Sequence, residues 1–76
     1  MSAVPEEIRV GQVWVDPHGD RLQVISVDSA SERALLRVRY PMGYLGLRRP
    51  PTLTEEIVRH WSYEGMSAAL EQRRMS

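Results

Sequence analysis

Alternating side chains between Val10 and Tyr40 constrain the fold of this chain more than any other feature of its sequence. A period of two places one set of side chains on each face of a β-strand. The clearest run spans residues 33–40, where one face carries Ala34, Leu36, Val38 and Tyr40 and the other carries Leu35, Arg37 and Arg39. The pattern therefore predicts an antiparallel β-meander and not a helical bundle.

A turn signature joins the first two predicted strands, residues 10–15 and 21–27. Asp16, Pro17 and Gly19 stand where a type I turn favours Asp, Pro and Gly, and Gly19 can adopt the left-handed conformation of a bulged hairpin. We expect Val13 and Val15 to face the core with Leu22 and Val24, and Trp14 to lie on the opposite face. Residues 28–32 are small and polar and predict the second turn.

The second half of the chain predicts shorter elements. Residues 44–49 indicate a weaker fourth strand, which Pro50 and Pro51 end because neither can donate a main-chain hydrogen bond. Thr54 has the features of a helix N-cap for a short helix over residues 54–60, and a start at Thr52 is the alternative. Residues 61–63 predict a last short strand, and residues 66–75 a brief helix or a tail.

Composition limits what this chain can be. Its 76 residues leave room for one domain, and ten basic and ten acidic residues give no net charge. The absence of Cys excludes disulfides, thiolate catalysis and Cys-based zinc sites. No apolar run approaches the roughly 20 residues of a membrane span, and the acidic N-terminus is unlike a secretory signal. We expect a cytoplasmic protein with no membrane partner.

The order of elements resembles the small SH3-like β-barrels, a group that includes KOW and Tudor modules. The residues that carry the resemblance are Gly11-Gln12-Val13-Trp14-Val15-Asp16, Gly19-Asp20-Arg21, Val24, Val27, Leu53-Thr54 and His60-Trp61. The chain is also similar to short "GQVW" proteins of GC-rich bacteria and their phages. The resemblance implies a mainly β barrel of about five antiparallel strands over residues 9–64, after a flexible tail (1–8) and before a short C-terminal helix or disordered tail (65–76).

Arginines and tyrosines form the strongest candidate binding surface. Arg21 and Gln23 should share a sheet face with Arg37 and Arg39, since paired antiparallel strands align these positions. The full predicted surface is Arg21, Gln23, Arg37, Arg39, Tyr40, Tyr44, Arg48 and Arg49. Arg and Tyr are enriched at protein interfaces, and they also suit nucleic acid. A solvated strand face whose arginine stems cover apolar surface is the third interpretation.

A second predicted surface is apolar, formed by Trp14, Ile25, Val27 and Leu35. If Trp14 is not packed with Ile25 and Val27 beneath the helix or the tail, these side chains form an exposed patch for a partner or a second copy.

Catalysis and cofactors find little support in the sequence. Asp16, His18 and Asp20 alternate around one turn, but the turn itself explains Asp16, so we expect no metal, no cofactor and no catalytic residue. We expect a non-catalytic module, monomeric or homodimeric, that binds another protein as an accessory or inhibitor, encoded by a phage or mobile element and acting on a host machine. A nucleic-acid-binding module and a homo-oligomeric structural protein are the alternatives.

Overall fold

The structure, a computed structural model, describes residues 4–70 and is mainly β. Within those residues six antiparallel strands form one sheet, accompanied by the short helices η1 and α1 and by a helical turn over residues 67–70. The strands are β1 (Gln12–Val15), β2 (Arg21–Asp28), β3 (Arg33–Arg39), β4 (Leu45–Arg48), β5 (Thr52–Leu53) and β6 (Ser62–Met66), and the helices are η1 (Pro41–Gly43) and α1 (Thr54–His60). The predicted mainly β class is therefore confirmed.

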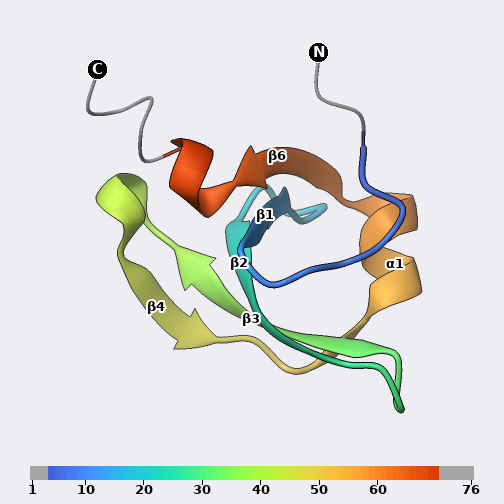
Figure 1. Cartoon of the computed structure of the whole chain (residues 1–76). Helices are drawn as coiled ribbons and strands as arrows, with labels where there is room; N and C mark the ends of the chain where they lie inside the picture. Colours follow the sequence, from blue (N-terminus) through green and yellow to red (C-terminus); the bar gives the residue numbers. More distant parts are fainter. Residues whose placement is uncertain (1–3, 71–76) are drawn as a thin grey trace.

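The strands follow the order β4-β3-β2-β1-β6, and the short β5 also pairs with β3. Both β4 and β5 lie along the same side of β3, one near each of its ends, because Pro50 and Pro51 interrupt what would otherwise be one strand. Figure 1 shows how the sheet curls around its centre, with α1 on one side of the molecule and the η1–β4 connection on the other.

The first turn forms as predicted, and Asp16 organises it. The Asp16 carboxylate oxygen Oδ1 accepts the main-chain N–H groups of His18 at 3.0 Å and Asp20 at 2.8 Å. Gly19 has a φ of 90°, a conformation in which a side chain would be strained. The turn sets the register of β1 and β2, which places Trp14 directly opposite Leu22.

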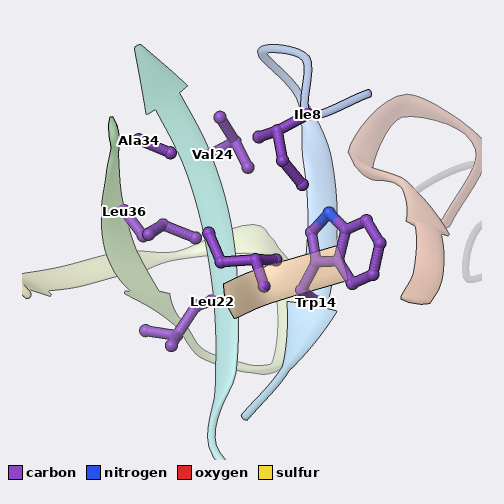
Figure 2. Close-up of a cluster of buried hydrophobic side chains, with 7 residues drawn as sticks. Ile8, Trp14, Leu22, Val24, Ala34 and Leu36 are labelled. Atoms are coloured by element: carbon purple, nitrogen blue, oxygen red, sulfur yellow. The ribbon is translucent and has the colours of Figure 1, made fainter. Parts of the chain in front are cut away.

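The core contains Trp14, against the prediction for its face. Side chains of β1, β2, β3, α1 and the N-terminal segment form it: Ile8, Trp14, Leu22, Val24, Ala34, Leu36 and Ile57 (Figure 2). Directly opposed residues share a sheet face, so Trp14 joins Leu22 on the inner side and Val13 joins Gln23 on the outer side. The expectation that Val13 and Val15 face the core is therefore wrong, although Val13 is fully buried on the outer face.

The N-terminal segment packs against the sheet at residue 8, where a flexible tail was predicted. Ile8 is 8% exposed and belongs to the core. Buried Gln12 holds the segment, because its Nε2 donates to the carbonyl of Glu7 at 3.1 Å. Its Oε1 accepts the indole N–H of Trp14 at 3.1 Å and the main-chain N–H of Arg9 at 3.0 Å. The side-chain amide of one residue thus joins the N-terminal segment to the core.

A β-bulge at Ile25 changes which side of β2 faces inward. The register runs from Val24 opposite Leu36 to Ser26 opposite Leu35, leaving Ile25 as the extra residue. Val27 is consequently paired with Ala34, a core residue, and lies on the inner side with 37% of its surface exposed. The prediction that Ile25 and Val27 share the outer face is wrong for Val27.

Helix α1 has the predicted bounds but begins differently. The residue before it is Leu53, and no side chain caps its first turn. Thr54 instead donates both its main-chain N–H and its hydroxyl to the carbonyl of Glu32, at 2.9 and 3.3 Å, so neither predicted N-cap forms. Ile57 anchors the helix in the core. Strand β6 is longer than expected, residues 67–70 continue as a helical turn, and the rest of the predicted C-terminal segment lies outside the described residues.

Candidate binding surface

The four predicted residues of β2 and β3 do share one face of the sheet. Gln23 is directly opposite Arg37, and Arg21 is opposite Val15 on the outer face. Arg39 follows two residues after Arg37, and its Nη1 donates to Oε1 of Gln23 at 2.8 Å. The prediction that these four residues share a sheet face is therefore confirmed.

The same face also carries its own counter-charge. Arg21 Nε lies 2.9 Å from Oε2 of Glu64, which β6 presents beside β1 and which solvent does not reach. A carboxylate from another strand thus offsets part of the positive charge that aligned arginines would otherwise accumulate. Since the Arg21 side chain is 58% exposed, water screens this pair.

Arg37 binds the main chain of β4. Its Nε donates to the carbonyl of Gly46 at 2.9 Å, and its Nη2 reaches the carbonyl of Leu45 at 3.4 Å. The register between β3 and β4 shifts at this point, from Arg37 opposite Arg48 to Arg39 opposite Leu45. Arg37 therefore supplies donors to an irregular stretch of β4, and that use leaves less of its guanidinium for a partner.

The two arginines after β4 have different surroundings. Arg49 Nη2 lies 2.5 Å from Oδ2 of Asp20, so Arg49 is paired with the first turn and not with the outer face. Arg48 is exposed, and within residues 4–70 its side chain has no ion pair or hydrogen bond. Of the two, Arg48 is the one available to a binding partner.

The η1–β4 segment, defined here as residues 40–48, displays four large apolar side chains to solvent. Their exposed fractions are 52% for Tyr40, 71% for Met42, 68% for Tyr44 and 81% for Leu47. Scattered single apolar residues are ordinary on a surface, but four within eight consecutive positions are a concentration. The sequence pattern predicted the two tyrosines but not Met42 or Leu47. Gly43, next to Met42, could have indicated a turn residue without core neighbours.

The main chain of the η1–β4 segment is held in place. Tyr40 N–H donates to the carbonyl of Tyr44 at 2.8 Å, and Gly43 N–H donates to the carbonyl of Tyr40 at 3.2 Å. Met42 has a φ of 73°, a left-handed conformation that costs roughly 1–2 kcal/mol for a residue with a side chain. The segment thus presents an exposed Met in a strained conformation, which is a feature of functional sites.

The predicted apolar surface does not form as one patch. Trp14 is completely buried, its ring centroid 5.1 Å from that of Tyr63, so it cannot contact a partner. Val27 lies on the inner side, while Ile25 and Leu35 are half-buried on the outer side. The register of β1 and β2 places Trp14 inside, and the bulge at Ile25 moves Val27 inward, so the predicted set is divided between two faces.

The remaining polar groups form shallow grooves. One groove of about 630 Å³ is lined by four carboxylates, from Glu6, Glu7, Glu32 and Glu55, and by one arginine, Arg59. Arg59 pairs with Glu55, and Arg9 pairs with Glu7. Among residues 4–70 no three His, Cys, Asp or Glu side chains are grouped closely enough to hold a metal ion. His18 is exposed on the first turn and His60 is exposed at the end of α1.

Comparison with family models, curated proteins and solved structures gives no match to this chain. Among the described residues, no helix has both the length and the apolar character needed to cross a membrane.

Proposed function

We propose that this chain is a non-catalytic protein-binding module that contacts its partner through the η1–β4 segment. The observation that carries the proposal is the exposure of Tyr40, Met42, Tyr44 and Leu47 within eight consecutive positions. Tyr, Met and Arg are enriched at the centres of protein interfaces, and exposed Arg48 ends the segment. A main chain already fixed by internal hydrogen bonds lowers the ordering cost of binding.

The strand arrangement supports the SH3-like barrel as the scaffold of this module. Three strands joined by turns, a fourth strand and a short helix directly before the last strand follow one another along the chain, which is the order on which the sequence resemblance rests. Such a scaffold is a platform for many functions, so the role of an accessory or inhibitor protein in the cytoplasm, encoded by a phage or mobile element, rests on analogy.

Site-specific photo-crosslinking in producing cells tests the proposal. A benzophenone amino acid at Leu47 should give a discrete adduct with one protein, because that side chain is 81% exposed in the proposed contact. The matched control places the same amino acid at Arg59 of α1, an exposed position on the other side of the molecule. Equal adduct patterns at both positions, or none at position 47, would count against the proposal.

Nucleic-acid binding is the second candidate, favoured by the proximity of exposed Tyr44 and Arg48 in one short segment. Tyrosine can stack on bases and arginine can contact phosphate. A gel-shift series with single- and double-stranded DNA and RNA at low and moderate salt tests it, because phosphate contacts weaken steeply as salt rises. Absence of any shift at low salt rejects this candidate.

A further inference from the structure

Charge is distributed unevenly along this neutral chain. Residues 33–49, which contain β3, η1 and β4, include five arginines and no acidic residue. Those arginines are Arg33, Arg37, Arg39, Arg48 and Arg49. The acidic residues therefore lie elsewhere, and four of them line the groove beside α1, on the side of the molecule away from the η1–β4 segment (Figure 1).

The neighbours of these arginines decide which of their charges are neutralised within the molecule. Arg49 is paired with Asp20, and Arg37 is bonded to neutral carbonyl groups, which leave its charge uncompensated. Arg48, directly opposite Arg37, is exposed and has no partner among the described residues. Two arginines that form no ion pair within residues 4–70 are thus paired in the register of β3 and β4, and the exposed Leu47 is next to one of them in the chain.

We propose that the partner of the η1–β4 segment is an acidic protein segment that carries an apolar anchor residue. This inference rests on the proposed function and names the chemistry of the partner. Carboxylates of the partner form an ion pair with Arg48 and are attracted by the positive charge of Arg37. The apolar side chain of the partner covers Leu47 and the exposed tyrosines. Charge complementarity of this kind raises the association rate and excludes basic partners.

The same observations disfavour two other occupants. A second copy meeting this segment edge to edge would bring its own Arg37 and Arg48 to the same place, and like charges that approach each other closely are destabilising. Phosphate-rich ligands require several free cations, whereas Arg49 is paired internally with Asp20. Exposed Met42 and Leu47 add apolar area that a phosphate backbone does not use.

A random-peptide selection tests this inference without assuming a sequence. The full chain is immobilised, a display library of random 12-residue peptides is selected on it at moderate salt, and the affinities of enriched peptides are measured by calorimetry. We expect enriched peptides to combine Asp or Glu with a large apolar residue. Arg48→Glu and Leu47→Ser should each weaken their binding about tenfold or more.

Arg59→Glu is the matched control, since it makes the same change in net charge on exposed α1 and should leave affinity unchanged. Thermal unfolding of each variant checks that the fold is intact. Neutral or basic enriched peptides, or acidic peptides that bind Arg48→Glu as well as the original chain, would overturn this inference and leave the proposed function standing. A library that yields no binder would overturn both.

Two further measurements complete the test. Sedimentation of the full chain over a range of concentrations should show a monomer, whereas a dimer that Arg48→Glu strengthens would replace the acidic partner with a second copy. Gel shifts with single-stranded DNA of random sequence, about 30 nucleotides long, should show no binding at moderate salt. A shift that Arg48→Glu abolishes would assign these arginines to phosphate instead.

Discussion

The guanidinium of Arg37 donates from Nε to the main-chain carbonyl of Gly46 at 2.9 Å and thereby attaches β3 to the irregular part of β4. Replacing Arg37 with Met should lower the free energy of unfolding by about 1–2 kcal/mol, because a carbonyl loses a charged donor. Arg37→Lys should recover only part of this loss, since an ammonium group cannot copy the planar fork of arginine. Urea unfolding followed by tryptophan fluorescence measures both.

Arg59→Met provides the comparison for Arg37. The pair that Arg59 makes with Glu55 is exposed on both sides, so its removal should change the free energy of unfolding by less than about 0.5 kcal/mol. Equal losses for Arg37→Met and Arg59→Met would show that the bonds to β4 do not stabilise the fold.

The hydrogen bonds of the buried Gln12 side chain should contribute strongly to the free energy of unfolding. Gln12→Met keeps the length of the side chain but leaves the buried indole N–H of Trp14 without an acceptor, for an expected loss of about 2 kcal/mol. The same change in a Trp14→Phe background should cost about 1 kcal/mol less, because that donor is already absent. A double-mutant cycle in urea measures the difference, and identical costs in both backgrounds would refute the role of this hydrogen bond.

Met42 should show opposite effects on stability and binding. Met42→Gly relieves the left-handed backbone strain and should raise the free energy of unfolding by about 1 kcal/mol while weakening partner binding. Met42→Ala keeps the strain and removes the exposed side chain, so it should weaken binding without the gain in stability. Thermal unfolding and the peptide affinities together separate the two effects, and equal stability of the Gly and Ala variants would argue against strain.

The pKa of Asp28 should depend on the hydrogen bonds of the second turn. The hydroxyl of Ser31 first, and then the main-chain N–H groups of Ala30 and Ser31, hold the pKa of the Asp28 carboxyl below its ordinary value of 3.8. A lowered pKa in the folded state stabilises the fold above the unfolded pKa, and this contribution disappears as the pH falls through the folded value. Ser31→Ala should raise the pKa of Asp28 in an NMR titration, while Ser29→Ala should leave it in place.

A side chain at position 46 should fit only if the Tyr40 ring moves. A Cβ atom at position 46 would overlap the Tyr40 ring. Gly46→Ala should therefore destabilise the chain by about 1 kcal/mol, and Tyr40→Ala in the same chain should remove that penalty. Chemical shifts of the Tyr40 ring provide the direct readout, and an unchanged ring environment in Gly46→Ala would contradict the packing.

Local patterns in the sequence predicted the elements whose causes are local. The Asp-Pro-His-Gly turn, the alternating residues of β3 and the bounds of α1 all follow from residues close together in the chain. The shared face of Gln23 and Arg37 also followed, because one turn fixes the register of two neighbouring strands. That much of the candidate surface was therefore visible in the sequence.

Contacts between residues far apart in the chain explain the features that the sequence did not predict. The face of Trp14 depends on the pairing of β1 with β2 and on an acceptor from Gln12, and no local pattern encodes either. The bulge at Ile25 reverses the later part of β2, so Val27 moved inward. Thr54 contacts the carbonyl of Glu32, 22 residues away in the chain, and this contact replaces the predicted cap.

Within residues 4–70, the arginines of β3 and β4 and the glutamates beside α1 lie on different sides of the molecule, and this separation of charge contributes an electric dipole. A net charge of zero removes the net electrostatic force that a uniform field would exert. The η1–β4 side and the groove beside α1 nevertheless experience opposite forces in the same field, and these forces add up to one torque. Near a negatively charged body the protein would therefore rotate before it touches. The arginine side would then face the negatively charged body before contact. This orientation would arise at distances within the Debye length, which is about 8 Å in physiological salt.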